Sequence, residues 1–227
     1  MKYEIIGDTV PFVQMTLEKG KSVYTQSGGM CWRDKNFEMI TDTKGGFFKG
    51  LGRMFAGDSV FMNTYKATEN NAQIAFSTTA PGEIVPLKLD GNNPGIIAQK
   101  GAFLCAEDGV NLKVALTKKF GAGLFGGEGF ILQDISGEGT VFLEVDGNIF
   151  KKELKDGETI LVDTGNIVYF DKTCKYEIET VKGVKNVLFG GEGFFLTRIV
   201  GPGVVVMQSQ NFHEFAARIV PFIPKDN

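Results

Sequence analysis

The heptapeptide Leu124-Phe125-Gly126-Gly127-Glu128-Gly129-Phe130 occurs twice in this chain, and its second copy runs from Leu188 to Phe194. The offset between the copies is 64 residues, from position 124 to position 188. The same offset pairs Leu132 with Leu196 and Gly137 with Gly201. A constant offset that continues beyond the motif indicates an internal duplication.

A third related segment is expected near the N-terminus. Residues 17–32 align with residues 154–169 at an offset of 137, from position 17 to position 154. The heptapeptide is degenerate in this segment, where it becomes Met54-Phe55-Ala56-Gly57-Asp58-Ser59-Val60. The alignment predicts one domain over residues 1–227 with three repeats at about 15–79, 87–145 and 152–209.

The repeats have the patterns of β-strands. Residues 13–17 and 110–114 alternate apolar and polar side chains, as half-buried strands do, and Asp-Gly pairs such as Asp146-Gly147 favour hairpin turns. Helical spacing occurs only at about 211–220, where we expect a short amphipathic helix that docks its phenylalanines on the β body.

The expected fold class is all-β. Three internal repeats of about 60 residues pack as β-sheets with pseudo-threefold symmetry, and one short C-terminal helix follows. One copy cannot cover its own apolar faces, so the copies must pack on one another. A β-trefoil is the alternative, but its repeats are usually shorter than these.

Composition excludes several classes of protein. The chain has 227 residues, of which 43% are hydrophobic, and a net charge of −3. Disorder and nucleic-acid binding through a positive field are therefore not expected. The sequence contains no apolar stretch typical of a signal peptide or a membrane span, so we expect a soluble cytoplasmic protein. Cys31 and Cys105 are expected as free, buried thiols.

The usual catalytic motifs are missing. The single histidine, His213, lies in the expected C-terminal helix, outside the repeats. The G-x-G-x-x-G match at residues 121–126 is not followed by a helix, which its phosphate-binding mechanism requires. We therefore assign no catalytic residue, no metal site and no cofactor from the sequence.

Two charged sets recur at equivalent places in the repeats. The first is an acidic set, whose members each follow a glycine or lie next to one: Asp58, Glu128 and Glu192. Under threefold symmetry the three carboxylates would lie on a ring around the axis. On a narrow ring these carboxylates could hold a hard cation. On a wide ring each would instead accept hydrogen bonds from its own glycine-rich turn.

The second set is basic and precedes the three heptapeptides: Lys44, Lys49, Arg53, Lys118, Lys119, Lys182 and Lys185. If these side chains share one face, they form a site for an anion or a lipid headgroup. Otherwise they keep long connections solvated and pair weakly with neighbouring acids.

Several glycine-rich stretches resemble an uncharacterised prokaryotic family. They are Gly28-Gly29-Met30, residues 45–53, Pro81-Gly82-Glu83-Ile84, Gly126-Gly127-Glu128-Gly129 and Val162-Asp163. The family includes the fungal "altered inheritance of mitochondria protein twenty-four", and the resemblance covers about Val13 to Pro224. It implies an all-β fold similar to the tryptophan RNA-binding attenuator superfamily, repeated within one chain. It assigns no catalytic residue, and the fungal relative's link to inner-membrane organisation implies scaffolding or membrane-proximal work.

Together these observations favour a non-catalytic scaffold or binding module that acts near a membrane. The alternative is a divalent-cation or small-molecule binding protein, or an enzyme, that uses the repeated carboxylates. A homo-oligomer and an anionic membrane surface are the partners that the sequence allows, and nucleic acid is not expected.

Overall fold

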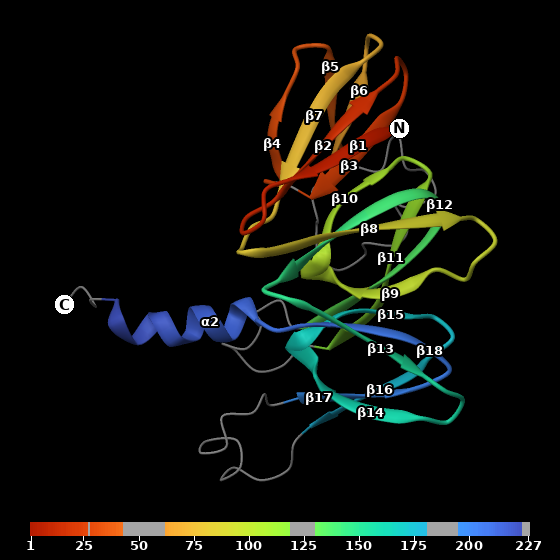
Figure 1. The fold of residues 1–227 in the computed structure, drawn as a ribbon, viewed down its shortest axis with the longest axis vertical. Coiled ribbons are helices and arrows are strands. Elements are labelled where there is room, and N and C mark those ends of the chain that lie inside the picture. Colours follow the sequence, from red (N-terminus) through yellow and green to blue (C-terminus); the bar gives the residue numbers. More distant parts are fainter. Residues whose placement is uncertain (27, 43–61, 119–129, 181–194, 224–227) are drawn as a thin grey trace.

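The structure is a computed structural model that describes residues 1–26, 28–42, 62–118, 130–180 and 195–223 (Figure 1). Strands dominate this part of the chain, as expected. They are β1 (Lys2–Ile6), β2 (Phe12–Leu17), β3 (Ser22–Gln26), β4 (Met30–Arg33), β5 (Phe37–Asp42), β6 (Met62–Ala67), β7 (Ala72–Ser77), β8 (Gly82–Asp90), β9 (Ile96–Gln99), β10 (Phe103–Glu107), β11 (Val110–Lys118), β12 (Phe130–Asp146), β13 (Ile149–Leu154), β14 (Thr159–Asp163), β15 (Ile167–Asp171), β16 (Lys175–Thr180), β17 (Phe195–Val200) and β18 (Gly203–Gln208).

The helical elements of the described residues are short. One α-helix, α2 (Phe212–Ile219), lies where a C-terminal helix was predicted, and the 3-10 turns are η1 (Lys100–Ala102), η3 (Thr164–Asn166) and η4 (Val220–Phe222). The predicted all-β class with one short helix is therefore confirmed for the described part of the chain.

The strands fall into three consecutive segments with the same pairing scheme. We name six strand positions A to F in chain order. They are β2 to β7 in the first segment, β8 to β11 and the two halves of β12 in the second, and β13 to β18 in the third. In each segment A pairs with F, B with E, C with F, and D with E, all antiparallel. Position C also carries a register shift against F in every segment.

Two strand pairs join the segments. β10 (position C of the second segment) pairs with β3 (position B of the first), and β15 pairs with β9 in the same way. We call these contacts junction 1 and junction 2. Each junction joins the A, F and C strands of one segment to the B, E and D strands of the segment before it.

The segments form an open row along the long axis of the molecule (Figure 1). Two partial sheets remain at its ends, β1-β2-β7-β4 and β14-β17-β16. Among the described strands these two sheets do not pair with each other. The pairing therefore does not confirm the expected pseudo-threefold arrangement about a common axis.

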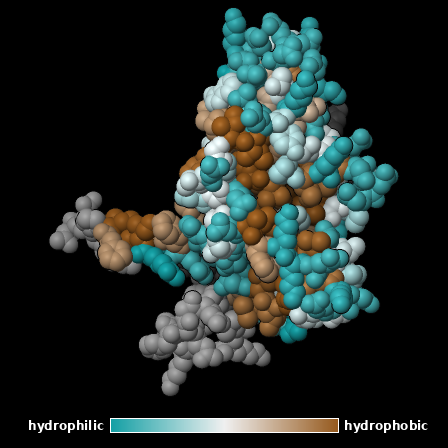
Figure 2. All heavy atoms as spheres, viewed as in Figure 1, coloured by the Kyte–Doolittle hydropathy of each residue, from teal (hydrophilic) through white to brown (hydrophobic). Residues whose placement is uncertain are grey.

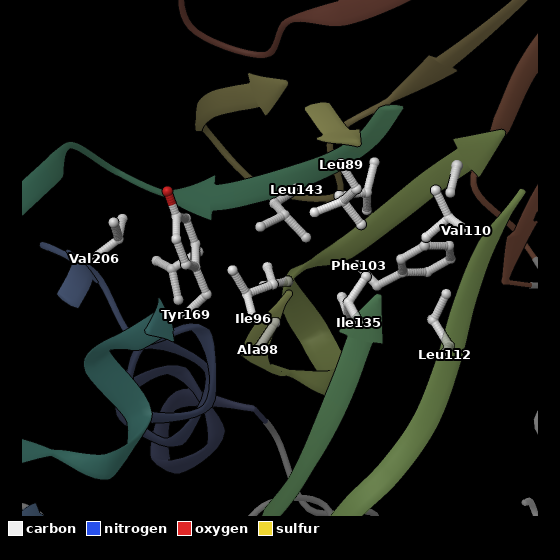
Figure 3. Close-up of a cluster of buried hydrophobic side chains, with 14 of the residues drawn as sticks. Leu89, Ile96, Ala98, Phe103, Val110, Leu112, Ile135, Leu143, Tyr169 and Val206 are labelled. Atoms are coloured by element: carbon white, nitrogen blue, oxygen red, sulfur yellow. The ribbon is translucent and has the colours of Figure 1, made fainter. Parts of the chain in front are cut away.

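The apolar core is continuous across the junctions. One cluster combines Tyr24 of the first segment, Leu143 of the second and Val206 of the third. Figure 3 shows how Ile96 and Tyr169 meet in this cluster although they come from different segments. Two further clusters each combine residues of neighbouring segments. Because the segments share these cores, none of them buries its apolar faces alone.

Two packing expectations were wrong. The phenylalanines of α2 are not covered by the β body as expected: Phe212 and Phe215 are each 48% exposed, although Phe212 borders a cavity of the body at the base of the helix. The helix extends away from the sheets instead (Figure 1). Cys31 is exposed on β4, whereas Cys105 is buried as expected. β4 lies at the end of the row, where no further described strand covers it.

Candidate functional site

The charged sets predicted from the sequence fall almost entirely outside the described residues. This holds for the whole acidic set, Asp58, Glu128 and Glu192, and for the basic residues Lys44, Lys49, Arg53, Lys119, Lys182 and Lys185. Lys118 is the last residue of β11, and its side chain is not described. The convergence of either set on one site therefore stays a prediction.

A different set of three carboxylates occupies equivalent places in the structure. Asp34, Glu107 and Asp171 lie at the end of position C in their segments. Each accepts a hydrogen bond from a backbone NH near the start of position F: from Gln73 at 2.8 Å, Thr140 at 2.7 Å and Val204 at 2.8 Å. These acids hold position C to position F in their own segments, and they do not form one cluster.

The sequence carried a signal for this set. Asp171 follows Glu107 by 64 residues and Asp34 by 137 residues, which are the two offsets at which the sequence resembles itself. These three acids were not predicted, because they lie outside the glycine heptapeptide, which is the more strongly repeated pattern. Among the described residues, no group of three or more His, Cys, Asp or Glu side chains is placed to hold a metal ion.

One carboxylate is buried across junction 1. Glu144 of β12 accepts hydrogen bonds through Oε2 from the backbone NH of Thr79 at 2.8 Å and from its hydroxyl at 3.0 Å. Burial raises the pKa of Glu144, and the two hydrogen bonds from Thr79 oppose that rise. Gln208 has the corresponding place in the third segment, where its Oε1 accepts from the NH of Asp146 at 3.0 Å.

A small polar cavity lies beside Glu144. Its volume is about 130 Å³, and Gln99, Gly101, Gln208 and Phe212 contribute to its lining. Such a space holds a few water molecules, whereas ligand pockets usually measure about 300–1,000 Å³. The cavity therefore does not suit an organic cofactor or substrate.

The base of α2 is held next to this cavity. Asn211 caps the helix, since its Oδ1 accepts from the NH of Glu214 at 3.4 Å and its carbonyl accepts from the NH of Phe215 at 3.0 Å. The Asn211 side chain lies against Gly165, where an added Cβ would be 1.8 Å from Nδ2. Gln208 also donates to the Gly165 carbonyl at 3.1 Å. The helix thus begins at a fixed point on the body.

Beyond that point the C-terminal segment exposes apolar side chains. The exposed residues are Phe212, Phe215, Ile219, Val220, Phe222 and Ile223, and we call them the C-terminal apolar surface. Phe212, Phe215 and Ile219 follow helical spacing on one face of α2, and Phe222 is 85% exposed. Figure 2 shows brown side chains on this helix, clear of the sheets.

Residues 3–210 match the sequence model of a protein family that is described as mitochondrial biogenesis AIM24. This chain belongs to the AIM24 family. An uncharacterized protein of Streptococcus pyogenes serotype M6 is 30% identical over 223 residues, covering 94% of this chain and 87% of that protein. The family resemblance inferred from the glycine-rich stretches is therefore confirmed.

A solved structure is similar over nearly the whole AIM24-family chain. The X-ray crystal structure of a Streptococcus pyogenes protein, a structural genomics target, matches with a TM-score of 0.79 and 27% identity. The match covers 98% of this chain and 99% of that one. Within the described residues no helix has the length and hydropathy needed to cross a membrane.

Proposed function

We propose that this AIM24-family chain is a non-catalytic scaffold made of three related β units, which attaches to a lipid surface through its C-terminal apolar surface. The observation that carries the proposal is the exposure of these side chains on α2 and on the residues just after it, with the base of the helix fixed by Asn211 and Gly165. Exposed apolar groups in a contiguous surface mark a binding face.

The chemistry of this surface suits the boundary between lipid headgroups and acyl chains. A short helix with aromatic residues on one face can lie in the plane of that boundary and bury the face. Full burial of a Phe or Ile side chain contributes about 1.5–3 kcal/mol. The side chains of the C-terminal apolar surface are 45–85% exposed before binding. Several of them together give reversible rather than permanent attachment.

The β body favours a scaffold over a catalyst. Two cavities among the described residues, at Glu144 and beside Ile96 and Asp171, measure about 130 and 250 Å³, and both are smaller than usual ligand pockets. The carboxylates of Asp34, Glu107 and Asp171 hold strands together. The basic set would also contribute to membrane binding if its side chains face the same lipid surface as the C-terminal apolar surface. Each cation near an anionic membrane contributes about 1 kcal/mol to the binding free energy.

Co-sedimentation with vesicles tests the proposal. The full chain is compared with a Phe215→Glu/Phe222→Glu variant on anionic and on zwitterionic vesicles. The matched control is Phe150→Glu, because Phe150 is an exposed aromatic residue on β13 that does not belong to the C-terminal apolar surface. We expect the double variant to lose at least about tenfold in binding, because two phenylalanines that are 48% and 85% exposed can no longer be buried in lipid.

The control variant is expected to bind as the native chain does. Failure of the native chain to sediment with either kind of vesicle would exclude lipid attachment. A variant in which the charges of Lys118, Lys119, Lys182 and Lys185 are removed by substitution tests the contribution of charge. This variant should lose binding to anionic vesicles alone.

Cation binding by Asp58, Glu128 and Glu192 is the alternative that the sequence offers. Calorimetric titration of Mg²⁺, Ca²⁺ and Mn²⁺ into the native chain and into Glu128→Gln tests it. Heat or a stability change that the variant lacks supports the cation site, and its absence in the native chain excludes it.

A further inference from the structure

Two strands at opposite ends of the row have an edge without a strand partner among the described residues. β4 pairs with β7 alone, and β14 pairs with β17 alone. β4 occupies position C of the first segment, and β14 occupies position B of the third. An exposed strand edge of this kind is a template for a further strand.

Inside the molecule, positions B and C pair with each other. Junction 1 places Cys105, Ala106 and Glu107 opposite Thr25, Tyr24 and Val23. Junction 2 places Tyr169, Phe170 and Asp171 opposite Ala98, Ile97 and Ile96. The two junctions use the same strand positions in the same antiparallel register, so one kind of contact joins every pair of neighbouring segments.

Side chains that the junctions bury are exposed at the ends of the row. Leu161 of β14 is 52% exposed, whereas its counterparts Tyr24 and Ile97 are only 1% and 7% exposed. Cys31 of β4 is exposed, whereas its counterparts Leu104 and Val168 are fully buried. Both ends therefore present uncovered surface where a junction would bury it.

We propose that β4 of one copy of this chain pairs antiparallel with β14 of a second copy, and so forms a third junction of the same kind between molecules. The register of the two internal junctions places Trp32 opposite Val162, Arg33 opposite Leu161, and Asp34 opposite Ile160. The sheet β1-β2-β7-β4 of one copy then continues into β14-β17-β16 of the next.

A second copy fits these edges because the two ends are complementary halves. The end with β4 has strands at positions A, F and C but lacks the B, E and D strands that would complete a junction. The end with β14 has strands at positions B, E and D but lacks A, F and C. β14 contains no lysine or proline, the residues that commonly block a sheet edge. The contact joins different surfaces of the two copies, so it leads to a closed ring or an open filament rather than a two-fold dimer.

Mass measurement in solution gives the first test. Light scattering on a size-exclusion column should show species larger than a monomer, and Leu161→Lys should shift them to monomer. Because Leu161 is exposed, this substitution leaves the folded monomer intact, which thermal unfolding verifies. Phe150→Lys is the matched control, since Phe150 is 61% exposed on β13, another edge strand, and should not change the mass.

Monomers at every soluble concentration would overturn the proposal. So would equal dissociation by the control substitution, because it would show association through a different edge or through nonspecific apolar contact. This test is independent of lipid binding, since neither Leu161 nor Phe150 belongs to the C-terminal apolar surface.

Disulfide trapping gives the second test and examines the register. Arg33→Cys and Leu161→Cys are made in separate chains that also carry Cys31→Ser, and the two chains are mixed under oxidising conditions. A cross-linked heterodimer is expected, because directly opposite residues in antiparallel strands fall within disulfide range. Thr159→Cys replaces Leu161→Cys in the control, and its displacement of two residues should reduce the yield severalfold.

Disulfides between two Leu161→Cys chains, without cross-links to Arg33→Cys, would show a two-fold β14 contact and overturn the head-to-tail pairing. Equal yields with the Thr159→Cys chain would overturn the register.

Discussion

The two internal junctions have the same strand pairing but different polar contacts. At junction 1 the hydroxyl of Thr25 donates to the Leu104 carbonyl at 2.6 Å, and Glu144 accepts from Thr79. At junction 2 Ala98 occupies the place of Thr25, and Gln208 that of Glu144. An ion pair between Lys172 and Asp134 is added there.

The comparison shows which interactions the two junctions share and which polar contacts differ between them. Both junctions share backbone pairing and a buried apolar side chain in position B, Tyr24 in one and Ile97 in the other. Burying such a side chain contributes about 1.5–3 kcal/mol, whereas a neutral hydrogen bond contributes about 1 kcal/mol. Polar contacts can therefore be exchanged between junctions if no buried group loses its partner.

The largest expected difference between equivalent positions concerns two glycines. An added Cβ at Gly165 would overlap Asn211, whereas at Gly101 the nearest atom would be 4.0 Å away. We expect Gly165→Ala to lower the free energy of unfolding by about 2 kcal/mol, through overpacking and loss of the helix cap. Gly101→Ala should lie within about 0.5 kcal/mol of the native chain. Urea unfolding measures both, and equal costs would contradict the assigned contact.

The next effect compares the three strand-holding carboxylates. Replacing Glu107 or Asp171 with alanine leaves a backbone NH without its partner, so we expect a loss of about 1.5–3 kcal/mol for each. Asp34→Ala should cost less, because β4 lies at an open edge where water can replace the carboxylate. Denaturant unfolding of the three variants checks this order. A cost for Asp34→Ala as large as the other two would indicate that the β4 edge is covered in solution.

The sequence predicted the strand content because its signals are local. Alternation at residues 13–17 and the Asp-Gly turns report on backbone conformation directly, and β2 and the β12–β13 turn occupy those positions. The offsets of 64 and 137 also relate residues with equivalent contacts, as Asp34, Glu107 and Asp171 show.

The packing of the C-terminal helix could not be predicted in the same way. Spacing at Phe212, Phe215 and Ile219 indicates an apolar face but not whether that face is covered. The burial of Glu144 was also missed, because its partner Thr79 lies 65 residues earlier and the sequence between them gives no sign of the contact. The candidate charged sets lie outside the described residues, so they remain sequence predictions.

Glu144 and Gln208 occupy equivalent positions, and exchanging their side-chain types should change the free energy of unfolding by a smaller, pH-dependent amount. Glu144→Gln should stabilise the chain at neutral pH, because the amide can still accept from Thr79 and carries no charge into a buried site. Gln208→Glu should destabilise it, because Gln208 has a similarly buried place at junction 2. Unfolding free energies of both variants against pH provide the measurement.

The sign follows from the raised pKa of Glu144 in the folded chain. The folded state favours the protonated carboxyl, so its stability is greatest below the ordinary glutamate pKa of about 4.3 and falls as pH rises through the folded value. The advantage of Glu144→Gln should therefore appear as pH rises and vanish in acid. An advantage that does not change with pH would show that ionisation is not its cause.

The smallest effect concerns the ion pair between Lys172 and Asp134 at junction 2, which has no counterpart at junction 1 in the part of the chain that the structure describes. Lys172 and Asp134 are partly exposed, so solvent and salt screen their attraction. Lys172→Ala should lower the unfolding free energy by less than about 1 kcal/mol at low salt. The loss should shrink further in 1 M NaCl, where the screening length falls to about 3 Å. A larger loss that salt leaves unchanged would mean that the lysine stem supports junction 2 by packing, and the polar contacts would then not be interchangeable.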